Sequence, residues 1–301
     1  MTLPELRELS TQGLKNYEIK VLNIYRRRAL YDKAIEENLS LRLLYKERVE
    51  QDDDISYKDL SRIEYEIAFL YQLTEQVEDA IAFFGYSIES AKKGNDLKGE
   101  MIAEHCISRI KYFSDLLTVD DVIAETQKHR DGFATLMHKS SDNKERTVCE
   151  GWVYNMDSYL LVLAVEACDL ELAEHAYPRV VQYLNENDMR ITGKHRLVSA
   201  LGMLNLVRGE YDQSLKAFSK LIDCDLSEWG EQDEELIHHI ENVLEFTPSR
   251  DYLHAGRALL GLGRTEMAMK VFNKGLKFPR TESNYFMLNK IEREIEQMEV
   301  A

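Results

Sequence analysis

Small and apolar residues recur at a helical spacing in two neighbouring stretches within residues 249–280. In each stretch they fall at positions i, i+3, i+4 and i+7, which places them on one face of an amphipathic helix. The first set is Tyr252, Ala255, Gly256 and Leu259, and the second set is Ala268, Val271, Phe272 and Gly275. Gly263 lies between the sets and is expected to end the first helix, and Thr265 is expected to cap the second. The pattern predicts two short helices folded against each other.

The small residues of these two stretches allow their backbones to approach closely. Gly256 and Ala268 face the seam between the helices, and Leu259 and Phe272 are expected to fill it. The stretch resembles the tetratricopeptide (TPR) repeat, with its large-x-x-small-Gly-x-x-large first helix, its Gly in the turn and its Ala-x-x-x-Phe-x-x-small second helix. A hairpin of this kind cannot bury its apolar face alone, so the resemblance implies a stack of such hairpins.

Weaker copies of the same pattern precede this stretch. They cover residues 14–50, 56–94, 97–137, 147–184 and 194–223, and residues 282–299 resemble a closing helix with a charged outer face. Ser56 is expected to cap a helix, and Gly94 and Asn95 are expected to end one. The spacing of the copies exceeds the roughly 34 residues of a strict TPR, and an extra helix is expected between residues 235 and 246. The chain is therefore predicted to form a divergent, TPR-like, right-handed all-α superhelix of about six hairpins in one domain, residues 1–301, with a C-terminal cap.

Two features are expected to interrupt this regular stack. The polar run Lys139–Arg146 has no apolar anchor and is predicted to be a loop and a hinge. Pro178 lies inside a predicted helix, where it removes one backbone hydrogen bond and is expected to kink the helix. Elsewhere the chain contains only 4 Pro and 14 Gly among its 301 residues, which favours helices nearly throughout.

The composition restricts the classes of partner. The formal net charge is −16, from 54 acidic and 38 basic residues, and such a surface repels a phosphate backbone, so direct nucleic-acid binding is not expected. No apolar run is long enough to cross a bilayer and no apolar leader is visible, so a cytoplasmic protein without a membrane partner is expected. The four cysteines have no C-x-x-C spacing and predict neither a zinc site nor a disulfide framework.

The sequence gives little support for catalysis. Nucleotide-binding glycine loops, the G-x-S-x-G nucleophile motif and H-E-x-x-H are all missing from it, so a non-enzymatic protein without a cofactor is expected. Glu235 and His238 form one E-x-x-H, a motif of helical di-iron sites, but such sites need a second copy and further carboxylates. A solvent-exposed helix face is the better interpretation of this motif.

A candidate binding surface follows from the hairpin pattern, because the first helices of TPR-like stacks line a concave groove. Aligning each pair on residues 249–280 places polar and aromatic residues along that groove: Asn23, Arg27, Arg62, Tyr65, Arg109, Tyr112, Asn155, Arg196, Arg250 and Arg257. Arginines in an acidic protein suit an acidic peptide or a terminal carboxylate, and asparagines suit its backbone. The alternative is that these arginines pair internally with glutamates such as Glu18, Glu66 and Glu104.

We therefore expect a protein–protein interaction module that binds a peptide segment of another protein. The TPR proteins that bind chaperone C-termini use a Lys/Asn carboxylate clamp, but Ile19 and Glu66 stand at two of its positions, so that activity is not carried over. Bacterial signalling-peptide receptors share the architecture, and a receptor without a DNA-binding domain remains an alternative. A scaffold that assembles with itself, for example as a homodimer, is another.

Overall fold

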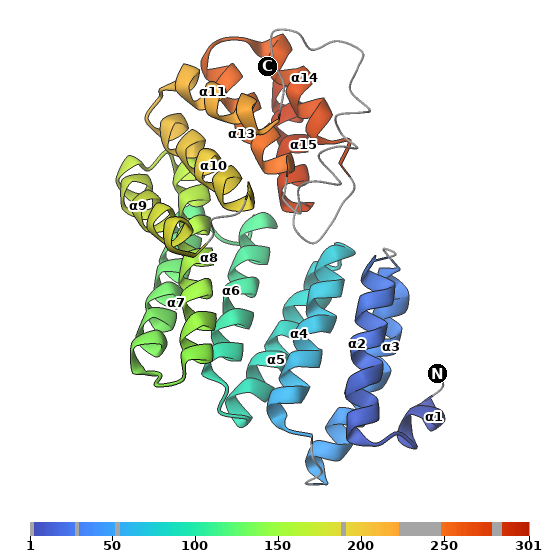
Figure 1. Cartoon of the computed structure of the whole chain (residues 1–301). Helices are drawn as coiled ribbons and strands as arrows, with labels where there is room; N and C mark the ends of the chain where they lie inside the picture. The colour runs from blue at the N-terminus through green and yellow to red at the C-terminus, as the bar shows by residue number, and fades with distance from the viewer. Residues whose placement is uncertain are drawn as a thin grey trace. The chain divides into compact units, whose positions relative to one another are not determined.

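The structure is a computed structural model that describes residues 3–27, 30–51, 55–187, 191–222, 248–278 and 285–300. Every regular element in these ranges is an α-helix (Figure 1), which confirms the all-α prediction there. The helices are α1 Leu3–Arg7, α2 Thr11–Arg27, α3 Tyr31–Glu50, α4 Tyr57–Leu73, α5 Val77–Lys93, α6 Leu97–Phe113, α7 Val119–Lys139, α8 Asn143–Ala167, α9 Leu170–Asn187, α10 Ile191–Val207, α11 Tyr211–Leu221, α13 Pro248–Gly261, α14 Thr265–Gly275 and α15 Tyr285–Val300. The predicted extra helix at 235–246 lies outside the described residues.

One type of turn ends many of these helices. A residue with positive φ follows α4, α5, α6, α8, α10 and α13, and these residues are Glu75, Asn95, Asp115, Cys168, Gly209 and Gly263. In each case the next backbone N–H donates to the carbonyl five residues back, at N···O distances between 2.7 and 2.9 Å. This is the Schellman motif, which satisfies carbonyls that a helix end leaves without partners. Its recurrence gives the described chain a repeated helix–turn–helix architecture.

The sequence located several helix ends but not always the residue responsible. Gly94 keeps a negative φ, and Asn95 adopts the left-handed conformation, because a short polar side chain tolerates that region. Ser56 caps α4 as predicted, in a capping box with Asp59. The capping prediction for Thr265 was wrong: Arg264 is the N-cap of α14 and contributes no side-chain hydrogen bond. The Schellman turn sets the start of α14, since the N–H of Arg264 bonds back to Leu259.

Close approach of paired helices depends on glycines that face aromatic rings. A Cβ added to Gly256 on α13 would lie 2.1 Å from a carbon of the Phe272 ring on α14. The preceding pair repeats the arrangement, since a Cβ on Gly202 of α10 would lie 2.7 Å from the Phe218 ring on α11. Phe272 and Phe218 are both fully buried. The predicted close packing of Gly256 against the second helix is therefore confirmed.

The chain divides into two compact units, residues Met1–Glu125 and Thr126–Ala301. The division falls inside α7 and does not coincide with the hinge expected at 139–146. Only residues 140–142 separate α7 from α8, because the Asp142 side chain accepts a hydrogen bond from the Lys144 N–H at 2.9 Å and so starts α8 early. The loop prediction for Lys139–Arg146 was therefore wrong for Lys139, the last residue of α7, and for residues 143–146. Pro178 lies inside α9, as predicted.

Helices next to each other in sequence pack together within each unit, and alternate helices also touch. In the first unit α4 contacts both α5 and α6, around a core that contains Ala68, Phe84 and Ala103. In the second unit α8 contacts α10, α10 contacts α13, and α13 contacts α15, while α9, α11 and α14 pack against their sequence neighbours. The helices α8, α10 and α13 therefore form a continuous layer.

Candidate functional site

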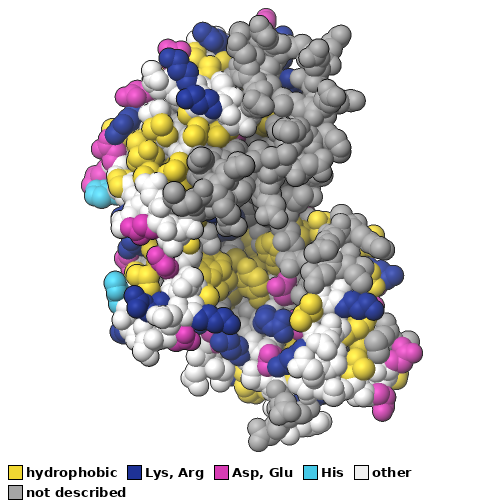
Figure 2. Space-filling view, viewed as in Figure 1, with side chains coloured by type: hydrophobic (Ala, Val, Ile, Leu, Met, Phe, Trp, Pro, Cys, Tyr) yellow, Lys and Arg dark blue, Asp and Glu magenta, His cyan; other side chains and the backbone are white. Residues whose placement is uncertain are grey.

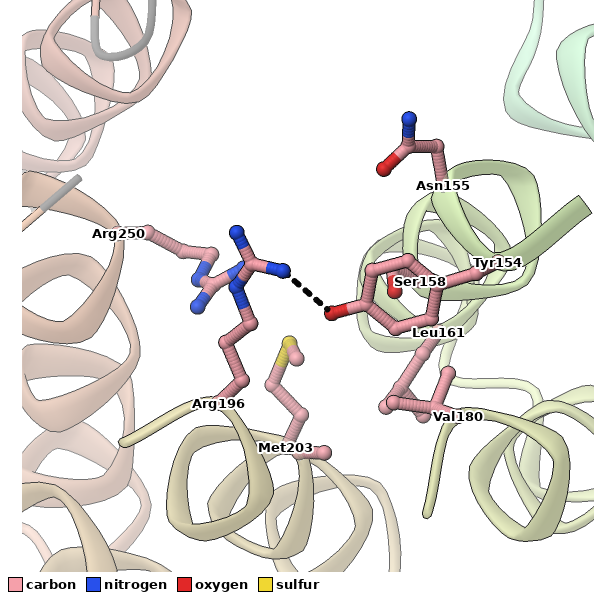
Figure 3. A pocket seen from close by; sticks show the side chains of 9 residues that line it. Tyr154, Asn155, Ser158, Leu161, Val180, Arg196, Met203 and Arg250 are labelled. Carbon is pink, nitrogen blue, oxygen red and sulfur yellow. Dashed lines mark hydrogen bonds between the residues drawn. The ribbon is translucent and has the colours of Figure 1, made fainter. Parts of the chain in front are cut away.

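A cavity with a volume of about 160 Å³ lies in the layer formed by α8, α10 and α13, with one residue contributed by α9. None of its described lining residues is acidic. The polar ones are Tyr154, Asn155, Ser158, Arg196 and Arg250, and the apolar ones are Leu161, Val180, Ala200 and Met203. In Figure 3, Arg196 and Arg250 extend from α10 and α13 toward a space that Tyr154 and Ser158 of α8 also face. The cavity therefore collects hydrogen-bond donors and two positive charges.

Arg196 is oriented by two aromatic residues. Its Nη1 donates to the Tyr154 hydroxyl at 3.4 Å (Figure 3), and its guanidinium carbon lies 5.7 Å from the centre of the Tyr154 ring. Tyr154 is in turn stacked on Tyr183 of α9, with ring centroids 4.2 Å apart. Stacked rings restrict the rotamers available to each other, so this wall of the cavity is pre-organised.

Arg250 is held from the other side by a short polar chain. Its Nη2 donates to the Ser199 hydroxyl at 3.0 Å, and that hydroxyl donates to the Asp251 carboxylate at 2.7 Å. The Arg250 Nε also lies 3.8 Å from the same carboxylate. This arrangement could not be predicted from the sequence, because Ser199 and Asp251 are far apart in the chain. The Arg250 guanidinium is therefore held in place by Ser199, and its charge is partly balanced by Asp251.

Two polar atoms at the cavity have no hydrogen-bond partner among the described residues. They are the Arg250 Nε and the Ser158 Oγ, and both atoms are buried. A buried donor without a partner costs about 1–3 kcal/mol, so native proteins usually satisfy such groups with protein, water or a ligand. Both atoms belong to residues that line the cavity, which makes the cavity a candidate ligand site.

A neutral histidine lies one turn along α13 from Arg250. His254 is completely buried, and neither of its ring nitrogens has a hydrogen-bond partner in the described part of the chain. Burial, followed by the positive charge of Arg257, lowers the pKa of His254 from 6.5 to about 3. The imidazole is therefore uncharged at neutral pH and adds no positive charge next to the cavity.

Arg257, a predicted groove residue, lies instead in a buried ion network. Its guanidinium contacts Glu166 of α8 and Glu294 of α15, each at 2.7 Å, and the Lys290 ammonium contacts Glu166 at 2.6 Å. Burial alone would raise the pKa of Glu166, but Arg257 and Lys290 lower it to about 2. The network fastens α15 to α8 and α13, so the structure assigns Arg257 to internal pairing.

Arg62 and Tyr65, predicted groove residues of the first unit, also make internal contacts. Arg62 forms a two-pronged ion pair with Glu18, which is fully buried and also accepts a 2.8 Å hydrogen bond from the Tyr45 hydroxyl. The Tyr65 hydroxyl lies 3.6 Å from the Cys106 sulfur, and burial raises the pKa of Tyr65. For Arg62 the alternative of internal pairing with Glu18 therefore holds.

The other predicted groove residues lie on α2 and α6, outside the helices that line the cavity. Arg109 and Tyr112 are half-buried on α6, where the Tyr112 ring lies 5.2 Å from that of Phe113. The backbone at Asn23 and Arg27 belongs to α2, but their side chains lie outside the described part, as do Glu235 and His238. Of the ten predicted groove residues, the structure brings Asn155, Arg196 and Arg250 together around one cavity.

The described residues contain no group of three or more His, Cys, Asp or Glu side chains arranged to hold a metal ion. They also contain no helix that is both long enough and apolar enough to span a membrane. On the face shown in Figure 2, acidic and basic side chains are scattered over the described surface, so the excess negative charge is not gathered in one patch there.

Comparison with known proteins adds little to this picture. No family model matches the sequence, and no curated protein matches it. The crystal structure of BtubC (BKLC) from P. vanneervenii is similar over 89% of this chain and 90% of that chain, at 14% sequence identity and a TM-score of 0.43. The proposals below therefore rest on the residues of this chain.

Proposed function

We propose that this protein is a non-enzymatic interaction module that binds a peptide segment of a partner protein against α8, α10 and α13. The anchor of the peptide is a negatively charged group that enters the cavity between Arg196 and Arg250. Asn155, which is exposed at the same cavity, bonds the peptide backbone through its amide.

The observation that carries this proposal is the set of donors that converge on the cavity. Arg250 and Ser158 each present a buried atom without a described partner, and no described lining residue is acidic. Stacking with Tyr154 fixes Arg196, and the hydrogen bond to Ser199 fixes Arg250, so little side-chain entropy is lost on binding. Charged hydrogen bonds in a pre-organised site are the usual anchors of peptide recognition.

The TPR-like right-handed superhelix is part of the same proposal. It is supported by the repeated Schellman turns and by the two glycine–phenylalanine contacts, Gly256 with Phe272 and Gly202 with Phe218. In such a stack the first helices of successive pairs line the inner surface. The cavity residues come mainly from α8, α10 and α13, which hold the first-helix position in their pairs.

The proposal can be tested by selection from a displayed library of random peptides. The full chain serves as bait, and the selected peptides are then tested on the double variant Arg196→Ala, Arg250→Gln. Affinities of the selected peptides are then measured by fluorescence anisotropy. Losing hydrogen bonds to charged groups costs about 1.5–3 kcal/mol each, so the double variant, which loses those of two arginines, should bind at least roughly 100-fold more weakly.

The matched control is Arg208→Ala, in the turn directly after α10. Arg208 is exposed and pairs with Glu174 on α9, and it does not line the cavity. This variant should bind the selected peptides as the parent does. Peptides that bind the double variant as tightly as the parent, while circular dichroism shows the same helix content, would refute the proposed site.

A further inference from the structure

The charged groups around the cavity indicate which kind of anion it accepts. This inference rests on the proposed function. We propose that the cavity selects a singly charged carboxylate over a doubly charged phosphoryl group, and that Asp251 sets this preference. The preference follows from the net charge of Arg196, Arg250 and Asp251 at the cavity.

Asp251 is a buried acidic residue close to the binding surface. Its side chain is 1% exposed, and one carboxylate oxygen is held by the Ser199 hydroxyl at 2.7 Å while lying 3.8 Å from the Arg250 Nε. Because the hydrogen bond fixes it, this carboxylate cannot turn away when a ligand arrives. An anion that binds Arg250 therefore shares the guanidinium with Asp251 and is repelled by it. Arg196, Arg250 and Asp251 together carry one net positive charge, which a singly charged anion neutralises, whereas a dianion leaves an uncompensated negative charge in the cavity.

The buried unsatisfied atoms suit a carboxylate ligand. Arg250 contributes one N–H donor at Nε, and Ser158 contributes one hydroxyl, and each can donate to a carboxylate oxygen. Figure 3 shows both side chains at the same open space. A phosphoryl dianion brings a second negative charge. Neutral His254, buried one turn along α13, provides no compensating positive charge.

The test uses the full chain with acetate and inorganic phosphate as probes at pH 8, where phosphate is mainly a dianion. The Arg250 Nε–Hε signal is assigned by nuclear magnetic resonance through its loss in Arg250→Lys, and its shift is followed in titrations. Acetate should bind the parent at least fivefold more tightly than phosphate. Asp251→Asn keeps a side-chain oxygen to accept the Ser199 bond but removes the charge, so it should favour phosphate at least tenfold more than the parent does.

The matched control, Asp212→Asn, removes an exposed carboxylate on α11 and should leave the ratio of the two affinities unchanged. Phosphate binding the parent as tightly as acetate would overturn the inference, as would an Arg250 signal that responds to neither probe. An unchanged ratio in a folded Asp251→Asn variant would also overturn it. If that variant does not fold, the ratio measured on the parent still decides the matter.

Peptides distinguish the two sources of a carboxylate. A selected peptide with a free C-terminus is compared with its amidated form, and an internal Glu is compared with Gln, so that loss of binding identifies the group that enters the cavity. Acetate binding without any selected peptide would retain the carboxylate inference and reject the proposed function. Peptide binding without an Arg250 response to acetate would retain the proposed function and reject the carboxylate inference.

Discussion

The close packing of α13 against α14 at Gly256 allows a direct test of the fold. In Gly256→Ala, the new methyl group on α13 would lie 2.1 Å from the Cε1 atom of Phe272, and no real Cβ atom tolerates that distance. Phe272 is completely buried, so its ring cannot move aside into solvent. The substitution must therefore separate α13 from α14 or push the ring into neighbouring side chains.

Two opposing effects set the size of the change. Replacing glycine by alanine inside a helix gains about 0.8–1.0 kcal/mol, and overfilling a packed core costs about 1–3 kcal/mol. Because the overlap at Gly256 involves a whole ring edge and not a flexible chain end, the cost should lie toward the upper end of that range. We expect Gly256→Ala to lower the free energy of unfolding by about 1–2 kcal/mol.

Gly151→Ala is the matched control, since it also lies inside a helix of the second unit. A Cβ there would meet only the Tyr183 hydroxyl, at 4.0 Å, so the helix-propensity gain should appear as a stabilisation of about 0.5–1 kcal/mol. Urea denaturation followed by circular dichroism at 222 nm measures both variants. A Gly256→Ala protein as stable as the parent would show that the seam between α13 and α14 is looser than the structure has it.

Three further predictions concern buried charge and helix capping. His254→Leu should remove an acid sensitivity. Because the pKa of His254 is about 3 in the folded state and about 6.5 in the unfolded state, the parent should lose up to about 2 kcal/mol of stability between pH 6.5 and pH 5. Urea denaturation at both pH values should therefore show the parent losing stability relative to the variant as the pH falls. Glu166→Gln leaves Arg257 and Lys290 buried without their shared carboxylate, so the substitution should lower the free energy of unfolding by about 3–5 kcal/mol at pH 7. The loss should become smaller as the pH falls from 4.5 toward 2, because the parent carboxylate itself protonates there. Thermal denaturation of both proteins at pH 7 and in this acidic range checks this. Ser56→Ala removes the cap of α4 and should cost about 1 kcal/mol, measurable as faster amide hydrogen exchange in the first turn of α4.

Periodicity predicted the helices well because it depends on local spacing. The contact of Gly256 with Phe272 followed from two residues in one hairpin, and Ser56 followed from a cap and its neighbours. Turn details were less predictable, since several residue types can occupy a Schellman turn. Glu75 and Asp115 adopt positive φ without being glycine or asparagine. Their conformation is imposed by the two backbone hydrogen bonds of the motif, which the side chain does not reveal.

The site was predictable only in part, because its chemistry depends on partners that are distant in sequence. The first-helix frame selected Asn155, Arg196 and Arg250, but missed Tyr154, which is adjacent to Asn155 and orients Arg196. It also missed Asp251, whose position next to Arg250 in sequence gave no hint of its bond to Ser199. A helical frame locates a face of the chain, whereas the pairing of charges on that face requires the packing of three helices.

The contrast between two arginines of α13 shows how packing separates structural from binding roles. Arg250 and Arg257 lie two helical turns apart, so both point to nearly the same side of the helix. Around Arg257, α15 supplies Glu294 and α8 supplies Glu166, so its donors are used within the protein. Around Arg250, the charge is only partly balanced by Asp251, and its Nε lacks a described partner. An anion that binds this face should therefore respond to substitution of Arg250, whereas substitution of Arg257 should act through the stability of α15.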